Sequence, residues 1–556
     1  MAAPVSPALF DQFARGWRGY VLIALIGLAS SLMGAAHVQV MDDDEARFAL
    51  VTRELVEHRV QPRTNIAAHR VQAVFVSALQ PVARHSTAIW PYRLPSAIGM
   101  ALAALATLWA GAALVGSRSA FFGAALFAAG MLVGFEGMLA TADAMALAAI
   151  TLAFAALAHL RTRPEKRRDA FIFWLAFACA LAMSGPGAAI VIAVALLGLS
   201  AWERRVAWLA PLLWWPALCF GAVMILLLEL WVAPRAFIGA PGFAEPDHNA
   251  LHGFALFLLP FLIFPATYAL PAAGRLIWDA ARAKRDTVEP APVRFLSAWA
   301  LPTTLIFALA PTSLAHNALP AYPAIALLCG AGLTAMRGRQ WRSVHPAGVV
   351  LFAVTGAVII AFTAMSATFM PGDFDADLRR AVSAGLIGVG IVAAALTALI
   401  MLRRPAARAA ILAVCALMLS FSLRERLLPE AGALNVSSEA IDVLTRARLL
   451  PSERRPLWVV GYDAPSLRFL LRDNVRFVGA DEASAHARVG EGLIVEGRTV
   501  QQVNAALAAR DLVFAPSEDP VRGLSLGRGN RVALFVGSVA PLSGDADAAG
   551  GRSRSP

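Results

Sequence analysis

Long apolar stretches are the feature that most constrains how this chain can fold. Only helices or closed barrels satisfy their backbone hydrogen bonds in lipid, and a helix needs about 20 mostly apolar residues to cross a bilayer. With 58% hydrophobic and 15% charged residues, the composition excludes a water-soluble enzyme, a disordered chain and a disulfide scaffold. We therefore expect an α-helical polytopic membrane protein with about 13 transmembrane helices, near residues 20–40, 95–116, 119–135, 142–160, 170–184, 187–202, 207–232, 254–273, 295–312, 318–336, 347–369, 382–402 and 408–423.

The charges orient these spans. With the N-terminus in the cytoplasm, the arginines and lysines of the short loops fall mainly on the inner side, and the short outer loops carry only Arg235, Arg379 and Arg380. This bias follows the positive-inside rule. The long first outer loop holds seven more arginines, but long loops cross the membrane largely regardless of charge. The net charge of +11 is thus explained by topology, and no nucleic-acid partner is expected. An odd number of spans places the C-terminal region outside the membrane.

Two outer segments are too long to be simple connections. The first outer loop, about 41–93, contains two amphipathic stretches, 45–58 and 71–82, which we expect to be helices lying in the membrane interface. The tail alternates expected strands (457–461, 475–478, 492–495 and 532–536) with expected helices (464–471 and 500–509). The predicted domains are a transmembrane domain over 1–423, a small periplasmic α/β domain over 424–543 and a disordered end over 544–556.

Four consecutive acids, Asp42, Asp43, Asp44 and Glu45, follow the first span. Acids at the start of a helix cap its backbone and complement its dipole. Four adjacent carboxylates also repel one another, so cations or a protonated member must relieve the repulsion. The cluster therefore suits a general base or a divalent-cation site as well as a cap.

Several short motifs occur in order along residues 1–340: Asp44-Glu45-Ala46-Arg47-Phe48-Ala49, Pro62-Arg63-Thr64-Asn65, Arg93-Leu94-Pro95-Ser96-Ala97, Thr141-Ala142-Asp143, Gly185-Pro186, His252 before Phe257, Pro260 and Pro265, and Leu319-Pro320-Ala321-Tyr322-Pro323. The first resembles the D-E-x-R-Y-A motif of ArnT-type glycosyltransferases, the 4-amino-4-deoxy-L-arabinose transferase type. These enzymes belong with the protein O-mannosyltransferases in the GT-C fold. Each motif is weak alone, and their ordered set is fairly specific.

The resemblance implies transfer of a sugar from a polyprenyl-phosphate donor to a lipid, such as lipid A, or to another acceptor. In this family's pattern Asp44 corresponds to the base or acceptor-orienting carboxylate, with Glu45 and Asp143 as supporting acids. Asp143 also begins a helix, so N-capping is an equally good interpretation. Arg47 and Arg93 are implied partners of the donor phosphate or structural residues.

The chain departs from the family at several polar positions. His69 and Arg70 stand where the family has the acid and lysine of E-K-P-P-L, and Ser184 replaces the lysine of K-G-P. Arg70 and His316 are therefore the candidate replacements for lost phosphate contacts. One interpretation is a divalent metal held by His69, His252 and a carboxylate. The better interpretation is that these are ordinary hydrogen-bonded histidines.

The resulting expectation is a glycosyltransferase of the bacterial inner membrane that acts at its periplasmic face, among membrane lipids. We expect the tail to cap the outer cavity or bind the acceptor. A flippase or transporter of a lipid-linked substrate is one alternative, although no repeated halves are visible. The second alternative is an inactive relative that serves in assembly, because several family cations are missing.

Overall fold

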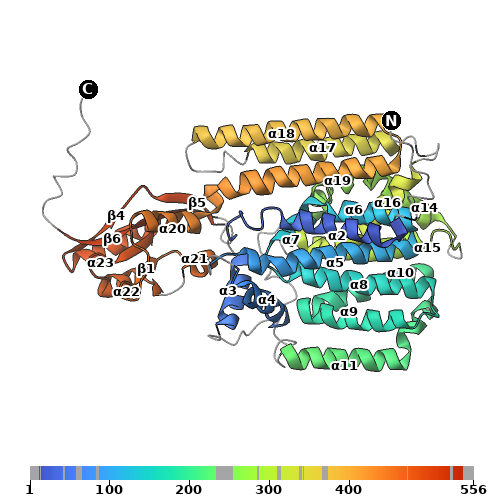
Figure 1. Cartoon of the computed structure of the whole chain (residues 1–556), viewed down its shortest axis with the longest axis horizontal. Helices are drawn as coiled ribbons and strands as arrows, with labels where there is room; N and C mark the ends of the chain where they lie inside the picture. The colour runs from blue at the N-terminus through green and yellow to red at the C-terminus, as the bar shows by residue number, and fades with distance from the viewer. Residues whose placement is uncertain are drawn as a thin grey trace. The chain divides into compact units, whose positions relative to one another are not determined.

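The computed structural model describes residues 12, 14–41, 44–57, 66–82, 87–232, 254–284, 287–309, 315–336, 341, 344–365, 374–471, 474–525 and 530–542. These residues form two compact units (Figure 1). The helical unit comprises 1–38, 51–365 and 381–428, and the sheet unit comprises 39–50, 366–380 and 429–556, within the described ranges. The helices α3 (Asp44–Val56) and α18 (Phe374–Met401) each cross from one unit into the other.

The helical unit is built of helices, most of which run side by side (Figure 1). They are α2 (Trp17–Leu32), α4 (Ile66–Leu79), α5 (Trp90–Leu114), α6 (Ser117–Ala128), α7 (Met131–Met138), α8 (Asp143–Thr162), α9 (Arg168–Ser184), α10 (Pro186–Glu203), α11 (Trp215–Val232), α13 (Phe254–Leu262), α14 (Leu270–Arg282), α15 (Ala291–Leu309), α16 (Tyr322–Ala335), α17 (Val344–Met365), α18 and α19 (Pro405–Phe421). Short 3-10 helices are η1 (Ala207–Leu213), η2 (Ala266–Ala269) and η3 (Ala315–Ala321), and a π-helical turn, η6 (Ser422–Leu427), follows α19.

Among the described residues, seven helices are long and apolar enough to cross a membrane, or up to ten if each of three bent pairs is one span. The chain is thus a multi-pass membrane protein. Each of the 13 predicted spans contains a helix, although the number that cross stays a prediction. The first helix ends at Leu32 rather than near residue 40, because the chain turns at Gly34, whose φ is +78°. The predicted span 254–273 is instead two helical segments bent by 113° at a break next to Pro265.

Small residues let the helices of this unit pack closely, as they do in membrane bundles generally. A Cβ added to Gly99 of α5 would lie 2.8 Å from the backbone carbon of Ala144 in α8. A Cβ on Gly123 of α6 would lie 2.8 Å from the carbonyl oxygen of Ala326 in α16. Both helix pairs therefore require glycine where their backbones meet.

The two helices expected in the first loop are present, with one shifted boundary. α3 agrees with the predicted 45–58 to within two residues. α4 begins at Ile66, five residues before the predicted start at Val71. Val71 and Gln72 stand where the family has two prolines, so nothing interrupts the helix. His69 and Arg70 consequently lie within a helix, and not in an irregular loop before it.

Both helices bury small and polar side chains, and α4 also exposes an apolar one. Glu45 and Thr52 of α3 are buried, as are His69 and Gln72 of α4. Val74, on the apolar face predicted for α4, is instead 66% exposed. Exposed apolar residues on a short amphipathic helix are what a position in the membrane interface requires.

The sheet unit contains a mixed six-stranded sheet, ordered β2-β1-β3-β6-β4, with β5 also paired to β6. Its strands are β1 (Leu457–Val460), β2 (Val475–Val478), β3 (Gly492–Glu496), β4 (Leu512–Pro516), β5 (Val521–Ser525) and β6 (Asn530–Pro541). β1 is parallel to β2 and β3, and β6 is antiparallel to β3, β4 and β5. The helices are α20 (Val436–Arg446), α21 (Pro465–Leu470), α22 (Ala480–His486) and α23 (Val500–Ala508).

Both faces of this sheet are covered, which explains its continuous apolar strands. Leu457 and Val459 of β1 pack in one hydrophobic cluster with residues of α20 and α21, and Trp458 and Val460 pack in the other with α22 and α23. The four predicted strands and two predicted helices of the tail are present. Four further elements, β4, β5, α20 and α22, were not predicted, and β6 is longer than the predicted 532–536.

Candidate functional site

The acidic motif opens α3. Asp44 is the first residue of this helix and is exposed, and Arg47 is exposed one turn later. Glu45 is 2% exposed, and its Oε2 accepts a hydrogen bond from the backbone N–H of Met41 at 2.9 Å. Glu45 therefore fixes the entry of the chain into α3, which leaves Asp44 as the accessible carboxylate of the pair. Asp42 and Asp43 lie outside the described residues.

A buried polar chain links α3, α4 and α5 inside the helical unit. The hydroxyl of Thr52 donates its proton to Oε1 of Gln72 at 2.6 Å. The Thr52 hydroxyl oxygen therefore accepts a hydrogen bond from Nδ1–H of His69 at 2.8 Å. Nε2 of Gln72 donates to the carbonyl oxygen of Tyr92 at 2.7 Å. In this tautomer the lone pair of His69 lies on Nε2. Burial lowers the pKa of His69 to about 4, so its imidazole is neutral at pH 7.

The predicted phosphate contacts differ in their surroundings. Arg70 of α4 is half-buried and already interacts with another group of the protein. Arg93 of α5 is fully buried, and its Nη1 donates to the carbonyl oxygens of Ala35 at 2.9 Å and Val38 at 2.7 Å. Arg93 therefore holds the turn that follows α2, which is a structural role. Phosphate binding by either arginine stays a prediction.

A cavity of about 100 Å³ lies in the helical unit between α8, α10, α15 and η3. Asp143 lies at its edge, exposed in the first turn of α8. Ser184 also lines it, as do Leu319 and Pro320. Residues from three motifs distant in sequence, Thr141-Ala142-Asp143, Ser184-Gly185-Pro186 and the segment beginning at Leu319, therefore share one cavity. Its other lining residues are small or apolar, including Ala146, Ile150, Val191 and Phe307.

Not every candidate can be placed. His252 lies outside the described residues. The backbone of His316 lies in η3, but its side chain lies outside the described part of the chain. Asp44, Glu45 and Arg47 belong to the sheet unit, whereas His69, Arg70, Arg93 and Asp143 belong to the helical unit. The structure thus groups the candidates in two sets.

Three polar residues of the helical unit were not among the predicted site residues. Thr52 and Gln72 complete the hydrogen-bonded chain of His69, and Glu136 of α7 is only 3% exposed. Glu136 could have been noticed as an acid within an otherwise apolar run, since acids inside membrane domains are usually functional. Thr52 and Gln72 gave no comparable signal, because single threonine and glutamine residues are common on helix surfaces.

No protein-family model and no curated protein matches this sequence. Two solved structures match it along nearly the whole chain. ArnT from Cupriavidus metallidurans in the apo state superposes with a TM-score of 0.70 at 17% identity, over 93% of this chain and 97% of that one. The chain has the ArnT fold. The same protein bound to undecaprenyl phosphate gives a TM-score of 0.70 at 17% identity, over 94% of this chain and 98% of that one.

The oligosaccharyltransferase AglB from Archaeoglobus fulgidus, in complex with an inhibitory peptide and a dolichol-phosphate, is less similar, with a TM-score of 0.43 at 12% identity. That match covers 83% of this chain and 64% of AglB. The ArnT fold confirms the expected fold class, a mainly helical membrane protein with a small C-terminal sheet domain. The periplasmic placement of that domain stays a prediction.

Proposed function

We propose that this chain is a membrane glycosyltransferase that moves a sugar from a polyprenyl-phosphate donor to a lipid, such as lipid A, or another cell-envelope acceptor at the periplasmic face of the inner membrane. The observation that carries the proposal is the cavity beside Asp143, where three separate family-like motifs meet within the ArnT fold. The structure of ArnT bound to undecaprenyl phosphate supports a donor of this class.

The reaction needs two kinds of group. A carboxylate takes the proton from the acceptor hydroxyl, whose oxygen forms a bond to the anomeric carbon while the bond to the donor phosphate breaks. The polyprenyl phosphate leaves with an added negative charge, which cations stabilise. Asp44 is our candidate base, and Glu45 and Asp143 are supporting acids. Arg47, Arg70, Arg93 and His316 are the candidate phosphate contacts.

The proposed reaction assigns no role to a metal ion at the candidate histidines. Among the residues that the structure describes, no three or more histidine, cysteine, aspartate and glutamate side chains gather as a metal site would require. Of the two candidate ligands, only His69 is described, and its Nδ1 is bound to Thr52. We therefore route no step through a metal.

The test is a transfer assay on the purified chain in detergent, with radiolabelled polyprenyl-phosphate sugars and with lipid A and peptides as acceptors. Asp44→Asn should lower the rate at least about 100-fold, the usual effect of losing a general base. Asp481→Asn is the matched control, because Asp481 is also an exposed acid in the first turn of a helix. Equal rates for the two variants would refute the role of Asp44. A folded wild-type protein inactive with every donor would refute the function.

A further inference from the structure

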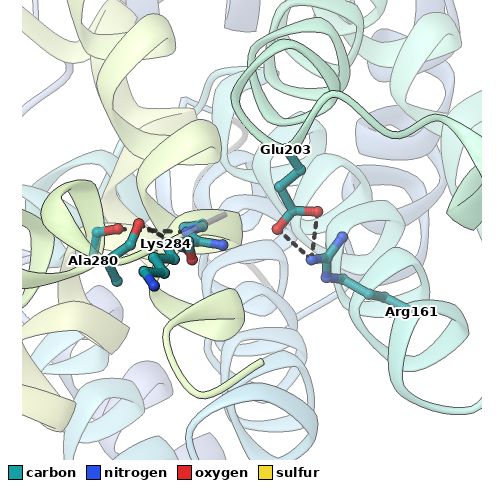
Figure 2. A network of polar contacts seen from close by, with 6 residues as sticks. Arg161, Glu203, Ala280 and Lys284 are labelled. Carbon is teal, nitrogen blue, oxygen red and sulfur yellow. Dashed lines mark hydrogen bonds and ion pairs between the residues drawn. The ribbon is translucent and has the colours of Figure 1, made fainter. Parts of the chain in front are cut away.

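Two connections in the helical unit bring many cations together. The segment from the end of α8 to the start of α9, 161–169, and the end of α10, 203–205, hold seven arginines and lysines and three acids. Nη2 of Arg161 donates to both carboxylate oxygens of Glu203, at 2.6 and 2.8 Å, and so joins the two segments (Figure 2). Arg167 also ties the first segment to the residue after η1, because its guanidinium carbon lies 4.8 Å from the ring centroid of Trp214.

Two of the three acids lie within ion-pair distance of an arginine. Glu203 is neutralised by Arg161, and Asp169 is 1% exposed with Nε of Arg168 at 3.5 Å. Glu165 is exposed, and this one acid cannot balance the four cations Arg163, Lys166, Arg167 and Arg204. The surface made by Arg163, Lys166, Arg167, Arg204 and Arg205, which we call the basic cluster, therefore carries a net positive charge, and all but Lys166 are exposed.

Large apolar side chains are exposed beside the basic cluster. Val206 is 67% exposed before η1, Leu213 is 66% exposed at its end, and Trp215 is 72% exposed at the start of α11. In a membrane protein, tryptophan next to arginine marks the level of the lipid headgroups. The ring of Trp214, which Arg167 contacts, also packs edge-on against the ring of Phe171 in α9, with 5.6 Å between the ring centroids. These contacts hold segment 161–169 and the start of α9 against the end of η1.

We propose that the basic cluster and η1 form a binding site for an anionic phospholipid. The arginines bind the phosphate groups, since a guanidinium matches phosphate oxygens in charge and geometry, and Val206, Leu213 and Trp215 contact the acyl chains. Charge complementarity favours this occupant, because clustered cations on the membrane surface of a helical domain attract anionic lipid headgroups. The site is separate from the cavity beside Asp143 and does not depend on the proposed transferase activity.

The test is native mass spectrometry of the detergent-purified full chain, titrated with cardiolipin or with zwitterionic phosphatidylethanolamine. Cardiolipin should be retained preferentially. The triple variant Arg163→Gln, Arg167→Gln and Arg204→Gln should weaken its apparent affinity about 100-fold, because each cation near a membrane contributes about fivefold. The matched control removes three exposed arginines of the sheet unit, Arg454, Arg455 and Arg488, and should keep wild-type affinity.

Three outcomes would overturn the proposal. They are equal retention of both lipids, equal loss in the site and control variants, and displacement of cardiolipin by inorganic pyrophosphate at similar concentration, which would indicate a soluble-anion site. If the triple variant does not elute as a single folded species, Arg163→Gln replaces it. Arg163 is exposed at the C-cap of α8, and its loss should cost about fivefold in affinity.

Discussion

His69 shows how burial gives a candidate metal ligand a measurable dependence on pH. It is 5% exposed and takes part in a hydrogen-bonded chain with Thr52 and Gln72. Its pKa is lowered to about 4 in the folded protein, against 6.5 for an unperturbed imidazole. As the pH falls through 6.5, the unfolded chain takes up a proton and the folded protein does not. Stability is therefore lost below pH 6.5, and the loss levels off near pH 4.

Replacing His69 tests this expectation. Linkage gives a loss of up to about 3 kcal/mol between pH 6.5 and 4 for the wild type. His69→Asn keeps an N–H donor for Thr52 but cannot titrate, so its unfolding midpoint should depend less on pH over this range. The measurement is thermal unfolding in detergent with a chelator present, at half-unit pH steps. Identical pH profiles for wild type and variant would contradict the buried, neutral histidine.

At the scale of elements, the contact between α5 and α8 determines where Asp143 lies. Gly99 of α5 meets Ala144, the residue after Asp143, and a Cβ there would also lie 2.9 Å from the backbone nitrogen of Met145. Gly99→Ala should therefore push the start of α8 away, at a cost of about 1–3 kcal/mol. We expect a lower unfolding midpoint together with lower transferase activity.

Gly390→Ala in α18 is the control for this prediction, because a Cβ there would meet no atom within 4 Å. It should be neutral or slightly stabilising, since alanine is the better helix former. Thermal unfolding and the transfer assay on both variants distinguish close packing from a general intolerance of alanine. If Gly99→Ala matched Gly390→Ala in both measurements, the contact would not position α8.

The elements also show what a single sequence can reveal. Apolar length predicted a helix in every expected span, because lipid leaves the backbone no alternative. Helix ends were less predictable: α2 stops early at a glycine turn, and α4 begins early because no proline interrupts it. The candidate acids of α3 and α8 were found from motifs. Their surroundings, such as the bond from Met41 to Glu45, depend on packing that periodicity does not encode.

At the scale of the whole molecule, the sheet unit has the components of an independently folding domain. Alternate residues of β1 belong to two different hydrophobic clusters, one on each face of the sheet. Strand β6 is central to this arrangement, because it pairs with β3 on one side and with β4 and β5 on the other. Only the middle of β6, 532–536, was predicted from the sequence. Neither β4 nor β5 has a sequence pattern strong enough to indicate a strand that pairs with the ends of β6.

This arrangement predicts that a fragment of residues 429–542 folds by itself, whereas a fragment ending at 529, which lacks β6, does not. Without β6 the strands β4 and β5 have no partner in the described sheet, and β3 becomes an edge whose apolar side chains lose much of their cover. Circular dichroism should show a cooperative thermal transition for the longer fragment and none for the shorter one. A non-cooperative longer fragment would mean that segments 39–50 or 366–380, grouped with this unit, are needed to complete its core.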